Sequence, residues 1–473
     1  MGKKLSVMIL AVLMACLMFL MIGCNEGKIP ETTTNDSPTD ENYPDYLRGK
    51  TFDGATFRLL VAAEALGEFF QEEDVEDNVD AAVYNRNLKV MDRHDVELEY
   101  VPEDGPTVMQ NTMLALVQGG DQSYDVFAPS YWWQIGNEGI ATNLADIAAF
   151  DFSQPWWYQG WNDALIYEGG EMYYCAGAVN QLEFFANTVV FLNRTLFDDV
   201  SAGYKNVSVE DIQQLVLDGG WTKDVMYEYV KLFGSDLDFN NTYDENDSYG
   251  NIVTFASVNT QLHAWGVNLT YEKVGDDYEW NFFTKGFLEK YEAYGRFLNN
   301  IWTTTTSDWT AWPNEAFVSG RALFLTTPLN NVNSLRQGDV DYTILPQTKY
   351  SESQKEYRTM GYGGILNAIP GCIVEVDRAA VILEALNYES YYSIMPEIQE
   401  TTLKYKVGQT DADRKILDLI YSTTSTNFAF VQGEYLKIGG VVLSGTNQNI
   451  ASTYFKNEEM YNQLLNELLK NET

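Results

Sequence analysis

Positive charge, histidine and cysteine are all scarce in this chain of 473 residues. Only 30 Lys and Arg residues stand against 68 Asp and Glu residues, which gives a formal net charge of −38. A surface of this sign repels phosphate groups, so neither nucleic acid nor anionic lipid is expected as an electrostatic partner. The charge suits a highly soluble protein exposed to the medium, with divalent cations as natural counter-ions.

The two histidines, His94 and His263, are too few for the common histidine-based catalytic sites. The sequence contains no zinc-binding histidine pair, no G-x-S-x-G nucleophile motif and no P-loop. His94 lies between a predicted helix and a predicted strand and is expected at the surface. His263 has no partner residue with metal-ligand spacing. We therefore expect no enzyme and no catalytic residue.

A single apolar run is long enough to enter a bilayer core. It extends from Leu5 to Ile22, follows Lys3 and Lys4, and ends at Gly23-Cys24. This arrangement resembles a bacterial lipoprotein signal, which implies that residues 1–23 are removed and that Cys24 carries the lipid. The protein would then be anchored by its lipid to the extracellular face of the cell membrane.

Two other interpretations of this run are open. A run of about 18 residues is also the lower limit for an uncleaved transmembrane anchor. Cys16 is a second candidate for lipidation, although it would leave the apolar tail Leu17–Ile22 on the mature chain. The polar residues 25–44 favour Cys24, because their composition is typical of a flexible tether.

Cys175 and Cys372 are the other two cysteines. An extracellular setting permits a disulfide between them. Whether the two side chains meet does not follow from their positions in the sequence, so two free thiols are an equal alternative.

The body of the chain alternates predicted strands and helices. Strands over 56–62, 96–101 and 124–128 are separated by helices over 78–93 and 106–118. This order predicts right-handed crossovers and a parallel sheet, whose ligands bind beyond the carboxyl ends of the strands. About 425 residues remain after the signal and tether, which is too many for one core and predicts two lobes. The later alternation has predicted strands over 188–192, 322–326 and 340–345 and predicted helices over 222–233, 375–388 and 411–421.

Seven short segments carry a resemblance through their order and spacing. They are Thr51-Phe52-Asp53-Gly54, residues 78–101, Val190-Phe191-Leu192-Asn193-Arg194, Gly220-Trp221-Thr222, residues 319–324, Ile344-Leu345-Pro346 with Lys349-Tyr350, and residues 381–386. Together they resemble the extracellular solute-binding proteins of ABC importers, specifically the sugar-binding group 1 lipoproteins of Firmicutes. The resemblance covers about residues 50–435.

The resemblance implies an α/β fold, namely the two-lobed periplasmic-binding-protein-like fold of type II, in which each lobe is a mostly parallel sheet flanked by helices. It also implies a monomer that captures a carbohydrate, in particular an oligosaccharide, between its lobes and delivers it to the transmembrane permease subunits of an ABC importer. The implied organisation is a signal peptide over 1–23, a flexible tether over 24–49, lobe 1 over 50–176 and 359–392, lobe 2 over 177–358, and a C-terminal helical segment over 393–473 that packs mainly on lobe 2.

The run from Asp236 to Asp247 has the ligand spacing of an EF-hand calcium loop. Hard oxygen ligands fall at positions 1, 3, 5, 7, 9 and 12 of that loop. Position 6 is Asn241 instead of Gly, which tolerates a left-handed backbone. We expect one structural calcium ion here, and a solvated acidic turn is the alternative. The predicted ligands are Asp236, Asp238, Asn240, Thr242 (through its carbonyl), Asp244 and Asp247.

Polar and aromatic side chains near predicted strand ends and lobe crossings are candidates for ligand binding. Gly177-Ala178-Val179-Asn180 lies at the expected first crossing, where relatives often carry Gly-Asp, and Gly361-Tyr362-Gly363-Gly364 lies at the second. The predicted ligand-binding residues are Trp132, Trp133, Asn180, Gln181, Glu183, Asn259, Gln261, Trp265, Thr327, Asn330 and Tyr362. Core packing is the competing interpretation for each tryptophan, and we expect it for Trp156, Trp157, Trp161, Trp309 and Trp312.

Two other classes of function are compatible with the sequence. A glycoside hydrolase or lyase needs only two carboxylates at a set separation, and the presence of 68 acidic residues leaves such a pair open. A surface adhesin would bind a glycan polymer without lobe closure and without transport. Turnover of an oligosaccharide would identify the enzyme, whereas saturable binding without turnover would identify the receptor.

Overall fold

A computed structural model of the protein provides the positions of most residues from 43 onward. The described ranges are 43–73, 75–130, 139–167, 169–258, 260–300, 302–306, 311–361, 363–404, 410–432, 436–438 and 449–470. Within these ranges, no helix is long and apolar enough to cross a membrane.

The first sheet is parallel, as the sequence predicts. Its strands lie in the order β2-β1-β3, with β1 at Ala55–Ala62, β2 at Val96–Glu103 and β3 at Val126–Ala128. Helix α3 (Asn78–His94) joins β1 to β2, and α4 (Pro106–Gln118) joins β2 to β3. The side chain of Asp77 caps α3 by accepting from the backbone N–H groups of Val79 and Asp80.

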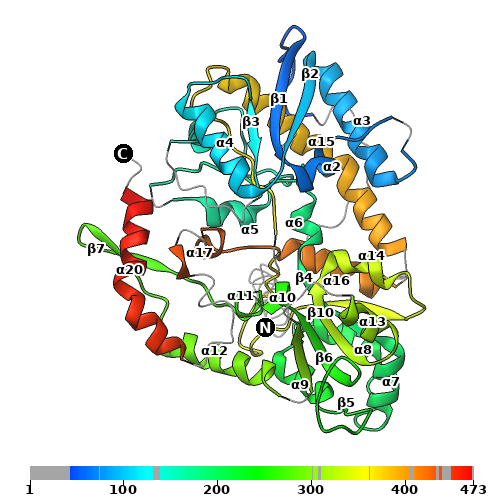
Figure 1. Ribbon diagram of the computed structural model, residues 1–473. Coiled ribbons are helices and arrows are strands. Elements are labelled where there is room, and N and C mark those ends of the chain that lie inside the picture. The colour runs from blue at the N-terminus through cyan, green and yellow to red at the C-terminus, as the bar shows by residue number, and fades with distance from the viewer. Residues whose placement is uncertain are drawn as a thin grey trace, which may run out of the picture. The chain divides into compact units, whose positions relative to one another are not determined.

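Helix α15 (Val376–Lys404) packs along α3, beside the first sheet (Figure 1). It extends well beyond the predicted range of 375–388. Its contact with α3 includes the fully buried guanidinium of Arg86. This group donates to Ser390 Oγ at 3.2 Å and to the carbonyl of Phe69 at 2.9 Å. Each of these hydrogen bonds offsets part of the desolvation cost of the guanidinium. The short helices after β1 are η2 (Ala63–Ala65) and α2 (Leu66–Phe69).

The second sheet is mixed, with the order β11-β4-β10-β6-β5 and with β9 paired to β6. Strand β4 runs antiparallel to both of its neighbours, β10 and β11, because the chain enters it from the first lobe. The strands β6, β9 and β10 are parallel to one another. The bounds are β4 Thr188–Asn193, β5 Gly234–Ser235, β6 Ser248–Thr254, β9 Thr303–Thr306, β10 Ala322–Pro328 and β11 Tyr342–Pro346.

Helix α16 (Asp411–Ser422) is fastened to the second sheet through one buried carboxylate. Asp413 accepts from Arg194 Nη2 at 3.1 Å, from Gln213 Nε2 at 2.5 Å and from Thr343 Oγ1 at 2.7 Å. Thr410 caps the helix and donates to the same carboxylate. These partners come from α7 (Arg194–Ala202), α8 (Val209–Leu217) and β11, so a single side chain joins four elements.

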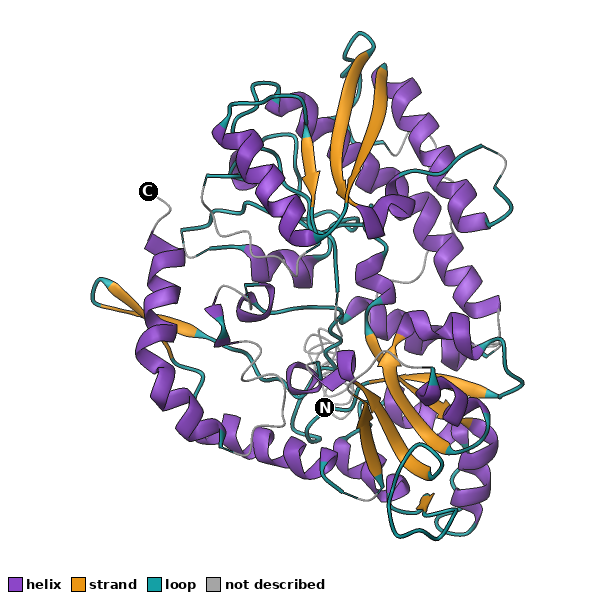
Figure 2. Ribbon diagram, viewed as in Figure 1, coloured by secondary structure: helices purple, strands orange, loops and turns teal. Residues whose placement is uncertain are grey.

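The C-terminal helix α20 (Ile450–Lys470) lies against the hairpin formed by β7 (Tyr271–Val274) and β8 (Asp277–Trp280) (Figure 2). Aromatic side chains from both form one buried cluster. Trp280 Nε1 donates to the carbonyl of Tyr461 at 3.2 Å, and Asn466 Oδ1 accepts from the N–H of Tyr278 at 2.9 Å. The face of α20 that carries Tyr454, Tyr461 and Leu465 is buried against these rings.

The remaining helices are short or flank the two sheets. Their bounds are η3 Leu144–Asp146, α5 Gln159–Asn162, η4 Asp163–Leu165, α6 Leu182–Phe185, α7 Arg194–Ala202, α8 Val209–Leu217, α9 Lys223–Val230, α10 Phe255–Val258, α11 Gln261–Ala264, α12 Lys285–Leu298, α13 Trp312–Val318, η5 Leu329–Asn331, α14 Val332–Leu335 and α17 Phe428–Val431.

The expectation that His94 lies at the surface is wrong. Its side chain is 1% exposed, and its Nδ1 atom lies 2.7 Å from the carbonyl oxygen of Lys50. The last turn of α3 is covered by the segment that leads into β1, where Phe52 packs against the imidazole. Burial lowers the pKa of His94, so the ring is held neutral.

The question about the two cysteines is answered in favour of free thiols. Cys175 is buried and Cys372 is half-buried, and neither forms a disulfide. Within the range expected to be a tether, Tyr46 donates to Glu384 Oε1 of α15 at 2.7 Å, and Leu47 is fully buried.

Replacing Asp413 by alanine should destabilise the protein by about 3 kcal/mol, because Gln213, Thr343 and the half-buried Arg194 lose the buried carboxylate that accepts their hydrogen bonds. The measurement is the urea midpoint of the soluble fragment from Asp45 onward. Asp411→Ala is the matched control, since Asp411 starts the same helix with a side chain that is 84% exposed. Equal midpoints for the two variants would contradict this role of Asp413.

Candidate functional site

The chain passes between the two sheets along two antiparallel segments. The first follows Cys175 and enters β4, and the second begins near Met360 and continues alongside β3. Bridges join Asn187 to Gly361 and Cys175 to Asn367, and the N–H of Thr188 donates to the carbonyl of Met360 at 3.1 Å. The predicted crossings at 177–180 and 361–364 lie in these segments. We therefore take this pair of segments, with α6, as the candidate site.

Two carboxylates hold the backbone of this site. Glu68 of α2 accepts from the N–H of Gln181 at 2.8 Å, and Glu183 of α6 accepts from the N–H of Ile365 at 2.8 Å. Burial raises the pKa of Glu68 to about 7. Burial, with repulsion from Glu68, raises the pKa of Glu183 well above its ordinary value. A carboxyl that is protonated near neutral pH can donate as well as accept.

Several buried polar atoms of the first crossing have no hydrogen-bond partner in the described part of the chain. They are Asn180 Nδ2, Gln181 Nε2 and Glu183 Oε2. The opposite segment adds Asn367 Oδ1 to these atoms. The Nδ2 atom of Asn367 donates to Asn180 Oδ1. Leaving such groups unpaired costs about 1–3 kcal/mol each. The set contains both donors and acceptors, which is what sugar hydroxyl groups need.

Close approach of the two segments depends on Gly364. A Cβ atom there would lie 3.0 Å from Glu183 Oε1 and 3.0 Å from the six-membered ring of Trp161. The fully buried indole of Trp161 thus lies beside the same carboxylate.

The other predicted ligand-binding residues lie in different parts of the structure and differ in burial. Trp265 lies in the aromatic core, and its Nε1 donates to Thr348 Oγ1 at 3.1 Å. Thr327 is fully buried and bonded to Thr254 and Asn331, whereas Asn330 is exposed. Gln261 is buried near Thr348 and Gln347. The predictions for Trp132, Trp133, Asn259 and Tyr362 lie outside the described residues.

The tryptophans for which we expect core packing are buried or half-buried where they are described. Trp156 and Trp157 both donate their Nε1 protons to the buried carboxylate of Glu384, at 2.9 and 3.0 Å. Burial raises the pKa of Glu384 to about 7 despite these hydrogen bonds. Trp161 is buried, Trp312 is half-buried, and Trp309 lies outside the described residues.

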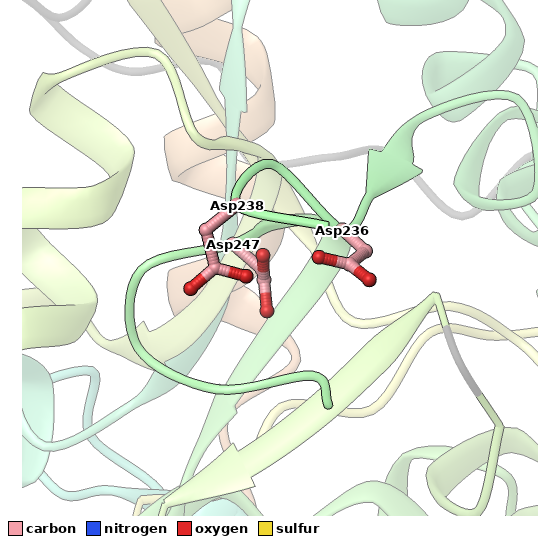
Figure 3. A group of neighbouring side chains, drawn as sticks. All are labelled: Asp236, Asp238 and Asp247. Carbon is pink, nitrogen blue, oxygen red and sulfur yellow. The ribbon is translucent and has the colours of Figure 1, made fainter. Parts of the chain in front are cut away.

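The predicted calcium loop joins β5 to β6 and gathers three carboxylates. The ligand atoms of Asp236, Asp238 and Asp247 lie within 4.8 Å of one another, inside the turn of the loop (Figure 3). Asn241 has a left-handed backbone with φ of 61°, as its position in the loop requires. Loop N–H groups donate to the three aspartates, for example Asn241 to Asp236 Oδ2 at 2.8 Å.

The donor set fits a hard cation, because all of its atoms are oxygens and a loop of this shape can wrap one. The other three predicted ligands bond within the loop. Asn240 Oδ1 accepts from the N–H of Thr242 at 2.6 Å, and Asp244 Oδ1 accepts from the N–H of Asn246 at 2.8 Å.

Two site residues were not found from the sequence, namely Glu68 and Asn367. Glu68 lies in a short acidic helix 113 residues before its partner Gln181, and nothing local distinguishes it from its neighbours Glu64 and Glu72. Asn367 follows the predicted second crossing by three residues. Its position opposite Asn180 depends on the antiparallel register of the two segments.

Comparison with solved structures establishes the fold. A cyclo/maltodextrin-binding protein complexed with maltotetraose matches with a TM-score of 0.52 and 11% identity, over 89% of this chain and 97% of that chain. An ABC substrate-binding protein from Listeria monocytogenes in complex with cycloalternan matches with a TM-score of 0.51 and 14% identity, over 87% and 99%.

A third match is the galacto-N-biose-/lacto-N-biose I-binding protein of an ABC transporter from Bifidobacterium longum, with a TM-score of 0.51 and 13% identity, over 89% of this chain and 98% of that chain. The fold is therefore the two-lobed fold of type II periplasmic binding proteins. No protein-family model and no curated protein matches the sequence.

The raised pKa of Glu68 makes stability depend on pH. The ordinary pKa is 4.5 and the folded value is about 7, so the folded state retains a proton that the unfolded chain has lost. Stability should therefore fall by about 3 kcal/mol as pH rises from 4.5 to about 8, and Glu68→Gln should flatten this slope. Urea unfolding at a series of pH values measures it. Glu72→Gln, at an exposed position nearby, is the control and should keep the wild-type slope.

Proposed function

We propose that this protein is a lipid-anchored extracellular receptor that binds a carbohydrate, in particular an oligosaccharide, and delivers it to an ABC importer. The observation that supports this best is the set of unpartnered buried donors and acceptors at Asn180, Gln181 and Glu183, on a crossing segment of a type II binding-protein fold. Solved structures with this fold hold maltotetraose, cycloalternan and lacto-N-biose.

The proposed mechanism is a shift between open and closed arrangements of the two lobes. A ligand that contacts residues from both sheets stabilises the closed arrangement by its differential affinity. The crossing segments are the natural hinge, since few residues there would need to change their backbone angles. The closed form would then dock on the permease subunits, and the protein would act as a monomer without chemical turnover.

The anchor is proposed from the signal-like sequence before Cys24, a residue outside the described ranges. A lipid on Cys24 would keep the receptor close to its transporter at the extracellular face of the membrane. Mass spectrometry of the membrane-extracted protein tests this directly, because lipidation at Cys24 removes residues 1–23 and adds acyl chains to the new N-terminus.

A substitution at Gln181 distinguishes a role in ligand binding from a role in stability. Its Nε2 makes no hydrogen bond in the described structure, so Gln181→Met should leave stability unchanged or slightly higher. If this amide serves the ligand, the same substitution should weaken oligosaccharide binding about tenfold, as the loss of about 1.4 kcal/mol does. Calorimetric titration with maltotetraose, cycloalternan and lacto-N-biose measures the affinity.

Gln463→Met, at an exposed position of α20, is the matched control for that titration, and its affinity should equal that of the wild type. Binding that is unchanged in Gln181→Met would contradict the assignment of this residue. Release of shortened products during the titration would favour a glycan-active enzyme over a receptor. No binding to any oligosaccharide would contradict the receptor.

We further propose that the loop Asp236–Asp247 holds one structural calcium ion. Asp236, Asp238 and Asp247 would supply carboxylate oxygens, with Asn240, Thr242 and Asp244 completing the shell. The ion would neutralise charge within an acidic loop and fix the connection between β5 and β6. It would lie away from the crossing segments, so it would stabilise the second lobe without contacting the carbohydrate.

Calcium should therefore raise the melting temperature of the wild-type protein but not of Asp238→Ala. At a free calcium concentration one hundred times Kd, mass action stabilises the folded state by about 2.7 kcal/mol. Glu245→Ala is the matched control, because Glu245 is an exposed acid of the same loop at a non-ligand position. Equal responses of the wild type and Asp238→Ala, or no response to calcium and none to EDTA, would contradict the site.

A further inference from the structure

Cationic side chains gather around one tyrosine of the second lobe. Lys223 Nζ lies 4.9 Å from the centre of the Tyr350 ring, and Lys290 Nζ lies 5.6 Å from it. Both Lys290 and Arg358 reach the segment after α11: a Cβ atom on Gly266 would lie 3.6 Å from Lys290 Nζ, and Arg358 donates to Asn268 Oδ1 at 2.6 Å. Burial, and then the charge of Arg358, lower the pKa of Lys290. We name Lys223, Lys290, Arg358 and Tyr350 the Tyr350 cluster. In a chain with 30 basic and 68 acidic residues, such a grouping is unusual.

The cluster is short of negative charge. Lys223 pairs with Asp224, whose side chain is 78% exposed. Within the described residues, Lys290 and Arg358 have no carboxylate at ion-pair distance, and Arg358 bonds only the neutral amide of Asn268, at 2.6 Å. Neighbouring cations that repel one another and lack a counter-ion are destabilising unless an anion joins them.

The residue before Tyr350 in the chain is a buried lysine. Lys349 is 3% exposed, and burial lowers the pKa of its ammonium while the charge of Glu352 opposes this effect. Its Nζ lies 5.3 Å from the centre of the Tyr357 ring. Lys349 and Tyr350 are adjacent in the chain, and the backbone of Lys349 is paired with the segment that starts α9 and carries Lys223.

The cluster lies at the edge of the sheet where ligands of α/β proteins bind. Tyr350 follows β11, and α11 follows β6. These two strands run in the same direction, so their carboxyl ends share an edge. The Tyr350 ring contacts Trp265 with a centroid separation of 5.5 Å, and Gln354 Nε2 donates to the carbonyl of Ala264 at 2.8 Å. The cluster is thus joined directly to α11.

We propose that Lys290 and Arg358, with Lys223 and the Tyr350 ring, form a binding site for one anionic group of carboxylate, sulfate or phosphate type. Arg358 supplies a planar pair of donors and Lys290 a point charge, a combination suited to such a group. The anion has two sources: an acidic substituent on a bound oligosaccharide, or a free inorganic ion. The first source rests on the proposed carbohydrate receptor, and the second does not.

The experiment is a calorimetric titration of the soluble fragment with inorganic phosphate, with trigalacturonate and with neutral galactotriose, at constant ionic strength. The variants are K290M and R358Q, with K285M as the control on the same helix, where the lysine side chain is 91% exposed. K290M and R358Q should each weaken binding of the anionic probe about tenfold, while K285M should match the wild type. Methionine retains the apolar stem of Lys290.

The outcomes separate the two sources. If trigalacturonate binds more tightly than galactotriose and K290M removes the difference, the anion belongs to the carbohydrate. If phosphate binds and responds to K290M but trigalacturonate gains nothing over galactotriose, the ligand is the free ion. Binding of phosphate no stronger than that of chloride, together with equal affinities for the two sugars, would overturn the site. Equal losses in K285M and K290M would also overturn it, because they would indicate a general charge effect.

A failure of both sugars to bind while phosphate still responds to K290M would contradict the carbohydrate receptor and leave the anion site supported. Urea midpoints of the three variants accompany each titration. R358Q leaves the lysine stems intact, so a loss of binding in R358Q at an unchanged midpoint cannot be attributed to misfolding of α12.

Discussion

The hydrogen bonds that Glu68 and Glu183 make to backbone N–H groups are the interaction on which the crossing between the lobes depends. Each carboxylate belongs to one segment and accepts from another: Glu68 from the start of α6, and Glu183 from the second crossing at Ile365. Backbone N–H groups in a buried crossing need acceptors, and the sheets cannot provide them where the chain leaves both. Two acidic side chains therefore accept the backbone hydrogen bonds that a neighbouring strand would accept within a sheet.

The position of these two carboxyls raises their pKa values, and this also explains the chemistry of the site. Burial raises the pKa of both carboxyls, and repulsion from Glu68 adds to the rise at Glu183. A protonated carboxyl can donate to a ligand hydroxyl, while the amides of Asn180 and Gln181 offer further donors. The groups that hold the crossing are thus the same groups that can recognise a polar ligand. A ligand bound there would contact both crossing segments, which is what a hinge-closing ligand requires.

The sequence predicts the local elements of this protein better than its long-range pairs. The parallel order of β1, β2 and β3 follows from hydrophobic patterns and capping residues such as Asp77, and α4 has the predicted bounds of 106–118. The mixed second sheet does not follow from such patterns, because the direction of β4 depends on where the chain enters from the crossing. The partnership of Glu68 with Gln181 is equally non-local. The burial of His94 does not follow from the sequence either. A residue at a helix end is predicted to be exposed unless the segment that covers it, here Lys50–Phe52, is known.

The distribution of the few positive charges is informative because acidic residues are so abundant. With 68 acids available, an ordinary structural cation easily acquires a carboxylate, as Arg194 does with Asp413 and Arg378 does with Asp125. Lys290 and Arg358 lie near one another without an ion-paired carboxylate in the described structure, although both are half-buried. Desolvation and mutual repulsion oppose that arrangement, and the contact of Lys290 with the Tyr350 ring offsets part of this cost. A ligand with negative charge would make the electrostatic contribution of these cations to the free energy favourable. The Tyr350 cluster lies at the sheet edge where ligands of α/β proteins bind.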